Sequence, residues 1–175
     1  MISHGLRKLT LALFATAVSA VILRADLSSA LVTRGDALAY FGQRDAARSA
    51  YAKALFFDPR NAVAADRYAF DAAMTYDSQT LRGCISIASR YLAKAPRDGA
   101  VLMDRALCYQ HERCLELAVV DFRRAGEVAR DARAFMFAAL DERALHRPAA
   151  ARELFEKALA TDPSFLPARR ELART

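Results

Sequence analysis

The stretch Ala47–Pro59, ARSAYAKALFFDP, decides the fold class of this chain. It places small residues at Ala47 and Ala54 on either side of the aromatic Tyr51, and it closes with proline. Small side chains spaced in this way let two helices cross closely, while the aromatic ring fills the gap to the next packed element. Proline ends the helix because it has no N–H group to continue the hydrogen-bond ladder. The stretch therefore predicts the second helix of a tightly packed helical pair.

The same spacing recurs further along the chain, which a chance match has no reason to do. Two good copies and one poor copy follow the first: Ala118, Phe122 and Ala125 with Arg130 in place of proline; Ala151, Phe155, Ala158 and Pro163; and Cys84, Ala88, Tyr91 and Pro96. In the poor copy, alanine stands where the aromatic residue is expected and tyrosine stands where alanine is expected. A generic alanine-rich helical bundle is the alternative, but it does not require a fixed period.

Together with Gly35, twelve residues before Ala47, this set resembles the tetratricopeptide repeat (TPR), whose helix pairs recur about every 34 residues. The resemblance implies an all-α TPR solenoid of about four helix-turn-helix repeats. The expected repeats are 28–61, 62–98, 99–131 and 132–165, with residues 166–175 as a C-terminal capping helix. The second repeat is about three residues longer than the family period. We place its extra residues in the turn Tyr76–Thr80, where Asp77 or Ser78 could cap the next helix.

An uncharged apolar run, Leu9–Leu23, precedes the repeats and follows Arg7 and Lys8. As a helix it would span roughly 22 Å, which is shorter than a bilayer core. We expect residues 1–24 to be a retained signal anchor or transmembrane helix, with the N-terminus cytoplasmic and the repeats on the exported, periplasmic side of a bacterial membrane. The alternative is cleavage after Ala20, which would release a soluble exported protein.

Composition limits the classes of partner. The 175 residues carry a net charge of +6 and 54% hydrophobic side chains, enough for one helical domain. Three of the positive charges flank the apolar run, at Arg7, Lys8 and Arg24, and the remaining arginines are scattered beside acids. No aromatic residues interleave with them as in nucleic-acid binding surfaces, so we expect no nucleic-acid partner.

The cysteines allow one disulfide if the repeats are exported. Cys108 and Cys114 flank an expected turn, so we expect them to be the pair, with Cys84 as the spare thiol. Cys108, His111 and Cys114 could instead be read as metal ligands, but no fourth ligand is evident, and we predict no metal site. No nucleophile, base and orienting acid can be named together, and no glycine-rich phosphate loop is present. We therefore predict no catalytic activity and no cofactor.

By the resemblance, the first helices of successive repeats line a concave groove that binds a protein partner. The residues carried over to this groove are Val32, Asp36, Tyr40, Asp66, Phe70, Met74, Met103, Leu107, Gln110, His111, Met136, Leu140 and Arg143. The set is largely apolar and has a methionine from each of three repeats, which suits a hydrophobic or amphipathic peptide segment. The alternative for any one of them is packing against a neighbouring repeat. The Lys, Asn and Arg clamp of TPR domains that grip chaperone C-termini is absent.

These observations predict a non-catalytic, membrane-anchored TPR module that serves as an accessory or assembly subunit of a membrane complex. A soluble exported TPR adaptor, cleaved near Ala20, is the second hypothesis. A thiol or metal protein that uses Cys108, His111 and Cys114 is the third. The sequence names neither the partner nor the process, because TPR repeats serve many processes.

Overall fold

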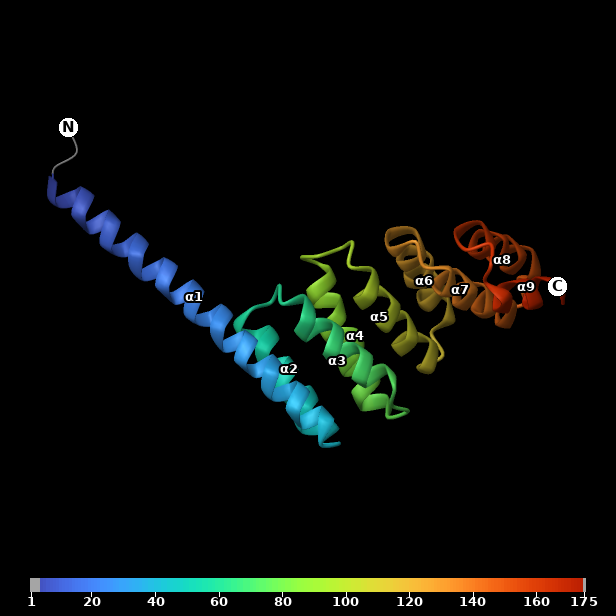
Figure 1. Cartoon of the computed structure of the whole chain (residues 1–175), viewed down its shortest axis with the longest axis horizontal. Coiled ribbons are helices and arrows are strands. Elements are labelled where there is room, and N and C mark those ends of the chain that lie inside the picture. The colour runs from blue at the N-terminus through green and yellow to red at the C-terminus, as the bar shows by residue number, and fades with distance from the viewer. Residues whose placement is uncertain (1–3, 175) are drawn as a thin grey trace. The chain divides into compact units, whose positions relative to one another are not determined.

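The computed structural model describes residues 4–174, with the side chains of residue 16 and of residues 18–174. Over this range the chain forms nine α-helices and no strand (Figure 1). The helices are α1 His4–Tyr40, α2 Arg44–Phe57, α3 Ala62–Ala73, α4 Ser78–Leu92, α5 Gly99–His111, α6 Leu115–Ala129, α7 Ala132–Ala144, α8 Pro148–Thr161 and α9 Leu166–Leu172. The all-α prediction is confirmed for the described residues.

Local sequence signals set where the helices begin and end. The carboxylates of Asp77, Asp98 and Asp131 accept hydrogen bonds from backbone N–H groups of the first turns of α4, α5 and α7. The expected cap at Asp77 is therefore confirmed. Pro148 opens α8, where a missing N–H costs nothing. Arg130, which replaces the closing proline, ends α6 in the left-handed conformation with a φ of 53°.

The chain divides into two compact units, Met1–Ala64 and Ala65–Thr175. In the first unit, α1 and α2 form an antiparallel pair joined by a tight turn at Gly42, whose φ is +76°. A Cβ on Gly35 would lie 2.3 Å from the ring of Tyr51, so only glycine permits this crossing. The Tyr51 hydroxyl donates to Asp36 at 2.8 Å. The buried Ser28 hydroxyl donates to the carbonyl of Ala54 at 2.9 Å.

Helix α1 runs without a break from the predicted anchor into the first helix of the first expected repeat. Residues 9–15 and 17 of the predicted apolar run lie outside the side chains that the structure describes. Across the part that is described, none of the helices combines the length and the apolar character needed to cross a bilayer.

In the second unit the recurring sequence positions form the main core. Phe122 and Phe155, at the aromatic position of their repeats, are fully buried, and so are Ala118 and Ala151 at the small-residue position. Alternating large and small side chains pack closely in this way. Ala168 brings α9 onto the same core.

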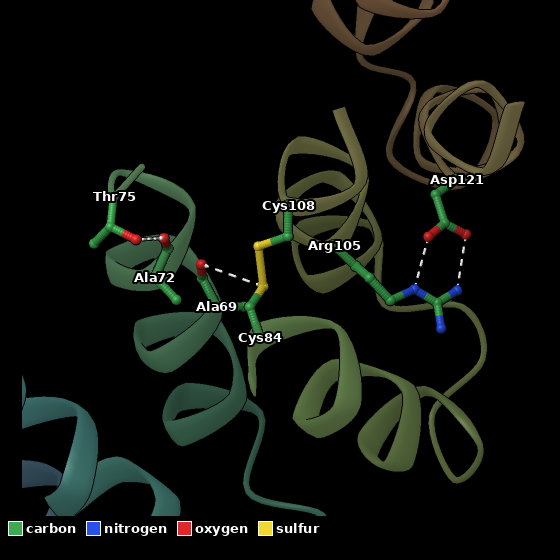
Figure 2. Close-up of a disulfide and its surroundings, with 7 residues drawn as sticks. All are labelled: Ala69, Ala72, Thr75, Cys84, Arg105, Cys108 and Asp121. Atoms are coloured by element: carbon green, nitrogen blue, oxygen red, sulfur yellow. Dashed lines mark hydrogen bonds and ion pairs between the residues drawn. A yellow bond between two sulfur atoms is a disulfide. The ribbon is translucent and has the colours of Figure 1, made fainter. Parts of the chain in front are cut away.

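A buried ion pair joins α5 to α6 (Figure 2). The Arg105 guanidinium donates to both oxygens of Asp121 at 2.7 and 2.8 Å, and its third nitrogen donates to Ser89 of α4 at 2.9 Å. Because guanidinium and carboxylate meet in two parallel hydrogen bonds, the charges compensate each other within the protein. Arg105 therefore ties three successive helices together.

Candidate functional site

The three predicted groove residues of the first unit lie in different environments. Val32 is only 8% exposed and packs with Ala54 and Ala64, so the structure removes it from any binding surface. Packing within the fold was the alternative given above for any single residue of the predicted groove. Asp36 is exposed and accepts the hydrogen bond from Tyr51. Tyr40, 86% exposed, lies at the end of α1.

In the second unit, α5 and α7 place four of the predicted apolar residues together on the main core. Met103 and Leu107 of α5 and Met136 and Leu140 of α7 are partly buried and pack against the same cluster of buried side chains. Each keeps part of its surface exposed. This set, Met103, Leu107, Met136 and Leu140, is called the apolar face below. Unbranched and flexible methionines let such a surface adapt to a partner.

Phe70 of α3 and Met74, the residue that follows α3, are 53% and 49% exposed, and the Met74 N–H donates to the Phe70 carbonyl at 3.2 Å. The two residues are four apart and therefore lie on one side of the helix axis. The ring of Tyr76, in the α3–α4 connection, lies 5.2 Å from the imidazole of His111 at the end of α5. The predicted His111 thus meets an aromatic neighbour that the sequence did not assign to the site.

Two polar atoms near this end lack hydrogen-bond partners among the described residues: Nδ1 of His111 and Oδ2 of Asp141. The amide of Gln110 donates to the other oxygen of Asp141 at 2.6 Å, so α5 and α7 are bridged there. Asp141 is 3% exposed, and burial raises its pKa to about 6. A donor from outside the described chain would satisfy the second oxygen.

A cluster of three carboxyls lies close to the start of α5. Its members are Asp66 of α3, Asp98, which caps α5, and Asp104 of α5. The hydroxyl of Tyr91 donates to Asp98 at 2.7 Å. Asp104 is 6% exposed, and burial together with the charges of Asp66 and Asp98 raises its pKa to about 8. Burial also raises the pKa of Asp66, against the lowering effect of Arg67.

The last predicted groove residue, Arg143 of α7, is engaged within the chain. Its guanidinium donates to the carboxylate of Glu171 on α9 at 2.6 Å, and the ion pair holds the pKa of Glu171 below its usual range. The capping helix therefore competes with any partner for this cation.

The predicted Cys108–Cys114 disulfide is wrong. Cys108 is bonded to Cys84, and this bond joins α4 to α5 (Figure 2). Cys114 is free and exposed. Both bonded cysteines are fully buried on facing sides of neighbouring helices, whereas Cys114 stands at the N-cap of α6. Cys108 is therefore not a thiolate that could bind metal. Within the described part of the chain, no three His, Cys, Asp or Glu side chains are grouped to hold a metal ion.

A shallow pocket of about 230 Å³ lies between α1 and α2 in the first unit. Its lining includes the apolar Leu31, Leu38 and Ala50 and the cationic Arg34 and Lys53. The lining also includes Ser49 and Gln43, and it holds no histidine or carboxylate.

Sequence reasoning missed Asp98, Asp104 and Asp141. Asp98 is the last residue of the second expected repeat, and the other two stand one residue beyond the predicted groove positions Met103 and Leu140. Aspartate is rarely buried without a partner, so an acid beside a groove position in a buried helix was the available signal.

No protein-family model matches the chain, and no curated protein matches it either. Solved structures do match. A MamA structure aligns with a TM-score of 0.69 and 18% identity over 84% of this chain and 79% of that one. PilF of Pseudomonas aeruginosa aligns with a TM-score of 0.67 and 22% identity, covering 86% and 68%. MamA of Desulfovibrio magneticus RS-1, from residue 41 to its end, aligns with a TM-score of 0.64 and 19% identity, covering 79% and 77%.

These neighbours are TPR-type proteins, so the chain has the TPR-type fold that the sequence pattern predicts. At such low identity the likeness concerns the fold alone.

Proposed function

We propose that this chain is a non-catalytic, membrane-anchored module that binds a protein partner and serves as an accessory or assembly subunit of a membrane complex. The observation that carries the proposal is the apolar face of the second unit, with the exposed Phe70 of α3 and Met74 that follows this helix. Apolar area left in water is unfavourable by about 25 cal/mol per Å² relative to burial, so burying the exposed part of these side chains against a partner would be favourable.

The partner that suits this surface is a hydrophobic or amphipathic segment. An amphipathic helix binds a groove through side chains at successive turns, which requires apolar positions from more than one supporting helix. The apolar face supplies such positions from α5 and α7. The MamA and PilF structures support the same reading, because they share a fold built for binding other proteins.

We infer the membrane anchor from the apolar run Leu9–Leu23. Its described C-terminal part is exposed, with Val21, Ile22 and Leu23 each more than half accessible. Arg7 and Lys8 before the run favour a cytoplasmic N-terminus and exported helices. The Cys84–Cys108 disulfide supports an exported location, because such bonds persist in oxidising compartments.

The proposal is tested by affinity capture of the full chain, tagged at its C-terminus, from gently solubilised native membranes. We expect integral membrane proteins to co-purify in a fixed ratio. Phe70→Glu together with Met74→Glu should abolish co-purification, because both side chains are about half exposed and become charged. The matched control is Leu117→Glu with Val120→Glu, exposed apolar residues of α6. Capture of the chain alone, or equal loss in both variants, contradicts the proposal.

The second candidate is a soluble exported adaptor, cleaved near Ala20. The intact mass of the native protein separates the two. A chain that begins at Val21 would establish the adaptor and exclude the retained anchor, whereas a full-length mass in the membrane fraction would do the reverse.

A further inference from the structure

The end of α2 that lies beside the proposed anchor exposes an aromatic side chain. Phe56 is 81% exposed, and its ring meets the ring of Phe57 edge to face at 5.4 Å. Ser28 of α1 sets the level of this end, because its hydroxyl donates to the carbonyl of Ala54 at 2.9 Å and accepts from the side-chain amide of Asn61 at 2.8 Å. The N-terminal part of α1 runs on past the end of α2 (Figure 1). Phe56 therefore stands where α1 leaves the helical pair.

Only a short length of helix separates this end from the apolar run. Ser28 follows Leu23, the last residue of the run, by five positions, which is about 7.5 Å of helix at about 1.5 Å per residue. Because α1 and α2 are antiparallel, Phe56 lies about 3 Å nearer to the run than Ala54, which is level with Ser28. Phe56 is thus about 4 to 5 Å beyond the run along the axis of α1. The headgroup region is about 5 to 8 Å deep on each side of a bilayer core, so Phe56 lies within it when the run is in the membrane.

The shortness of the run favours the same placement. As a helix the run would span roughly 22 Å, against about 30 Å for a bilayer core. A short span is accommodated by local thinning of the bilayer and by flanking side chains that reach the interface. Both responses bring the lipid headgroups closer to the end of α2. Leu27, 40% exposed on the adjoining turn of α1, adds apolar surface at this level.

Two cations at this end have no partner for their side chains among the described residues. Arg24 directly follows the apolar run, and Arg60 directly precedes Asn61; both are exposed, and neither guanidinium forms a hydrogen bond or ion pair in the part of the chain that the structure describes. A guanidinium binds a phosphate through two parallel charge-assisted hydrogen bonds. Lipid phosphates at the headgroup level would supply the partners that the chain does not.

Building on the proposed membrane anchor, we propose that the C-terminal end of α2 rests on the membrane surface, with Phe56 in the headgroup region and Arg24 and Arg60 at lipid phosphates. The proposal rests on retention of the anchor. A second contact beside the anchor sets the tilt of α1, because the tilt of a membrane helix depends on its interfacial side chains. The first helical pair is thereby held at a fixed orientation to the membrane.

The charges at this end select the kind of lipid. Asp26 is exposed on α1, and Asp58 accepts a hydrogen bond from the backbone N–H of Arg60 at 3.0 Å. These two carboxylates balance the charges of Arg24 and Arg60. An excess of anionic lipid is therefore not required, and a zwitterionic phosphatidylcholine surface is the expected occupant.

The chain contains no tryptophan, so one substitution supplies a single fluorescent probe. The test places full-length Phe56→Trp in phosphatidylcholine vesicles that carry bromine, a contact quencher of tryptophan, on the acyl carbons nearest the glycerol. We expect bromine to remove roughly half of the emission or more, because an indole ring at the interface touches these carbons. Tyr40→Trp is the matched control and should stay unquenched, since Tyr40 is 86% exposed at the opposite end of the same helical pair. Arg60→Gln in the F56W chain should weaken the quenching, because a headgroup contact is lost.

Equal emission of F56W in brominated and ordinary vesicles overturns the proposal, and so does equal quenching of Y40W. A blue-shifted F56W emission without quenching also overturns it, because protein, such as a second copy of the chain, then covers Phe56. Unchanged quenching after R60Q overturns the role given to Arg60. Flotation of the chain with the vesicles tests the anchor separately. If the chain floats while F56W is unquenched, the surface contact fails and the anchor stands; a chain that does not float contradicts both.

Discussion

Replacing Asp104 with asparagine should change how the stability of the protein depends on pH. In the folded protein the pKa of Asp104 is about 8, against an ordinary value of 3.8. The folded state therefore binds more protons than the unfolded state between these values, and stability falls as pH rises through this window. The difference in the proton affinity of Asp104 between the folded and unfolded states corresponds to roughly 5 to 6 kcal/mol of unfolding free energy, at about 1.36 kcal/mol for each tenfold change in affinity.

Side-chain relaxation and water entry reduce this figure, and we expect about 2 to 5 kcal/mol to be realised. The asparagine side chain cannot ionise, so D104N should unfold at nearly the same urea concentration as the wild type near pH 4. It should be more stable by about 2 to 5 kcal/mol near pH 8. The comparison isolates one group, although Asp141, with a pKa of about 6, gives both proteins a further slope of the same sign.

The measurement is urea unfolding of the full chain, with its disulfide intact, followed by far-ultraviolet circular dichroism at several pH values. E127Q serves as the control, because Glu127 is exposed on α6. Parallel stability curves for D104N and the wild type would refute the reasoning, as would a D104N variant that is less stable than the wild type near pH 8.

Three further predictions concern packing and cross-links. D121A should destabilise the fold by about 3 to 5 kcal/mol, because it leaves the Arg105 charge buried and unpaired. The double variant R105M with D121L removes both charges and should recover most of that loss in the same urea experiment. Equal loss of stability in the two variants would contradict this. G35A should lower the thermal midpoint by an amount equivalent to about 1 to 3 kcal/mol, because the new Cβ would lie 2.3 Å from the Tyr51 ring, and an unchanged midpoint would show that the ring moves freely. C84S with C108S should lower the free energy of unfolding by about 3 kcal/mol, because the disulfide closes a loop with a sequence separation of 24, whereas C114S should leave it unchanged. Alkylation of the wild type without reductant, followed by mass spectrometry, should find one modified cysteine. Two or more modified cysteines would count against the bond.

The sequence was sufficient for the helical framework because a repeat fixes the same contacts several times. Phe122 and Phe155 occupy equivalent positions and are equally buried, so each strengthens the prediction for the other. The Asp77 cap was predictable because a helix cap depends on neighbours within one turn.

The disulfide, the buried carboxyls and the burial of Val32 could not be predicted, because they depend on contacts between helices. The spacing of residues within one helix does not reveal such contacts. The Cys108–Cys114 prediction chose the nearest pair along the chain, whereas the bonded partner is 24 residues away on the adjoining helix. The charge of Asp66 on α3 acts on Asp104 of α5, and no sequence motif relates the two residues. Val32 has the composition of a groove residue, but its burial depends on how closely Ala54 and Ala64 approach.

The Cys84–Cys108 bond joins the second helix of one helical pair to the first helix of the next. Arrays of helical pairs ordinarily fray from their ends, since each pair is held only by its immediate neighbours. A covalent link across that boundary makes α4 and α5 open together or not at all. A partner that pulls on one of these pairs therefore pulls on both, and force applied at the binding surface is shared before any helix detaches.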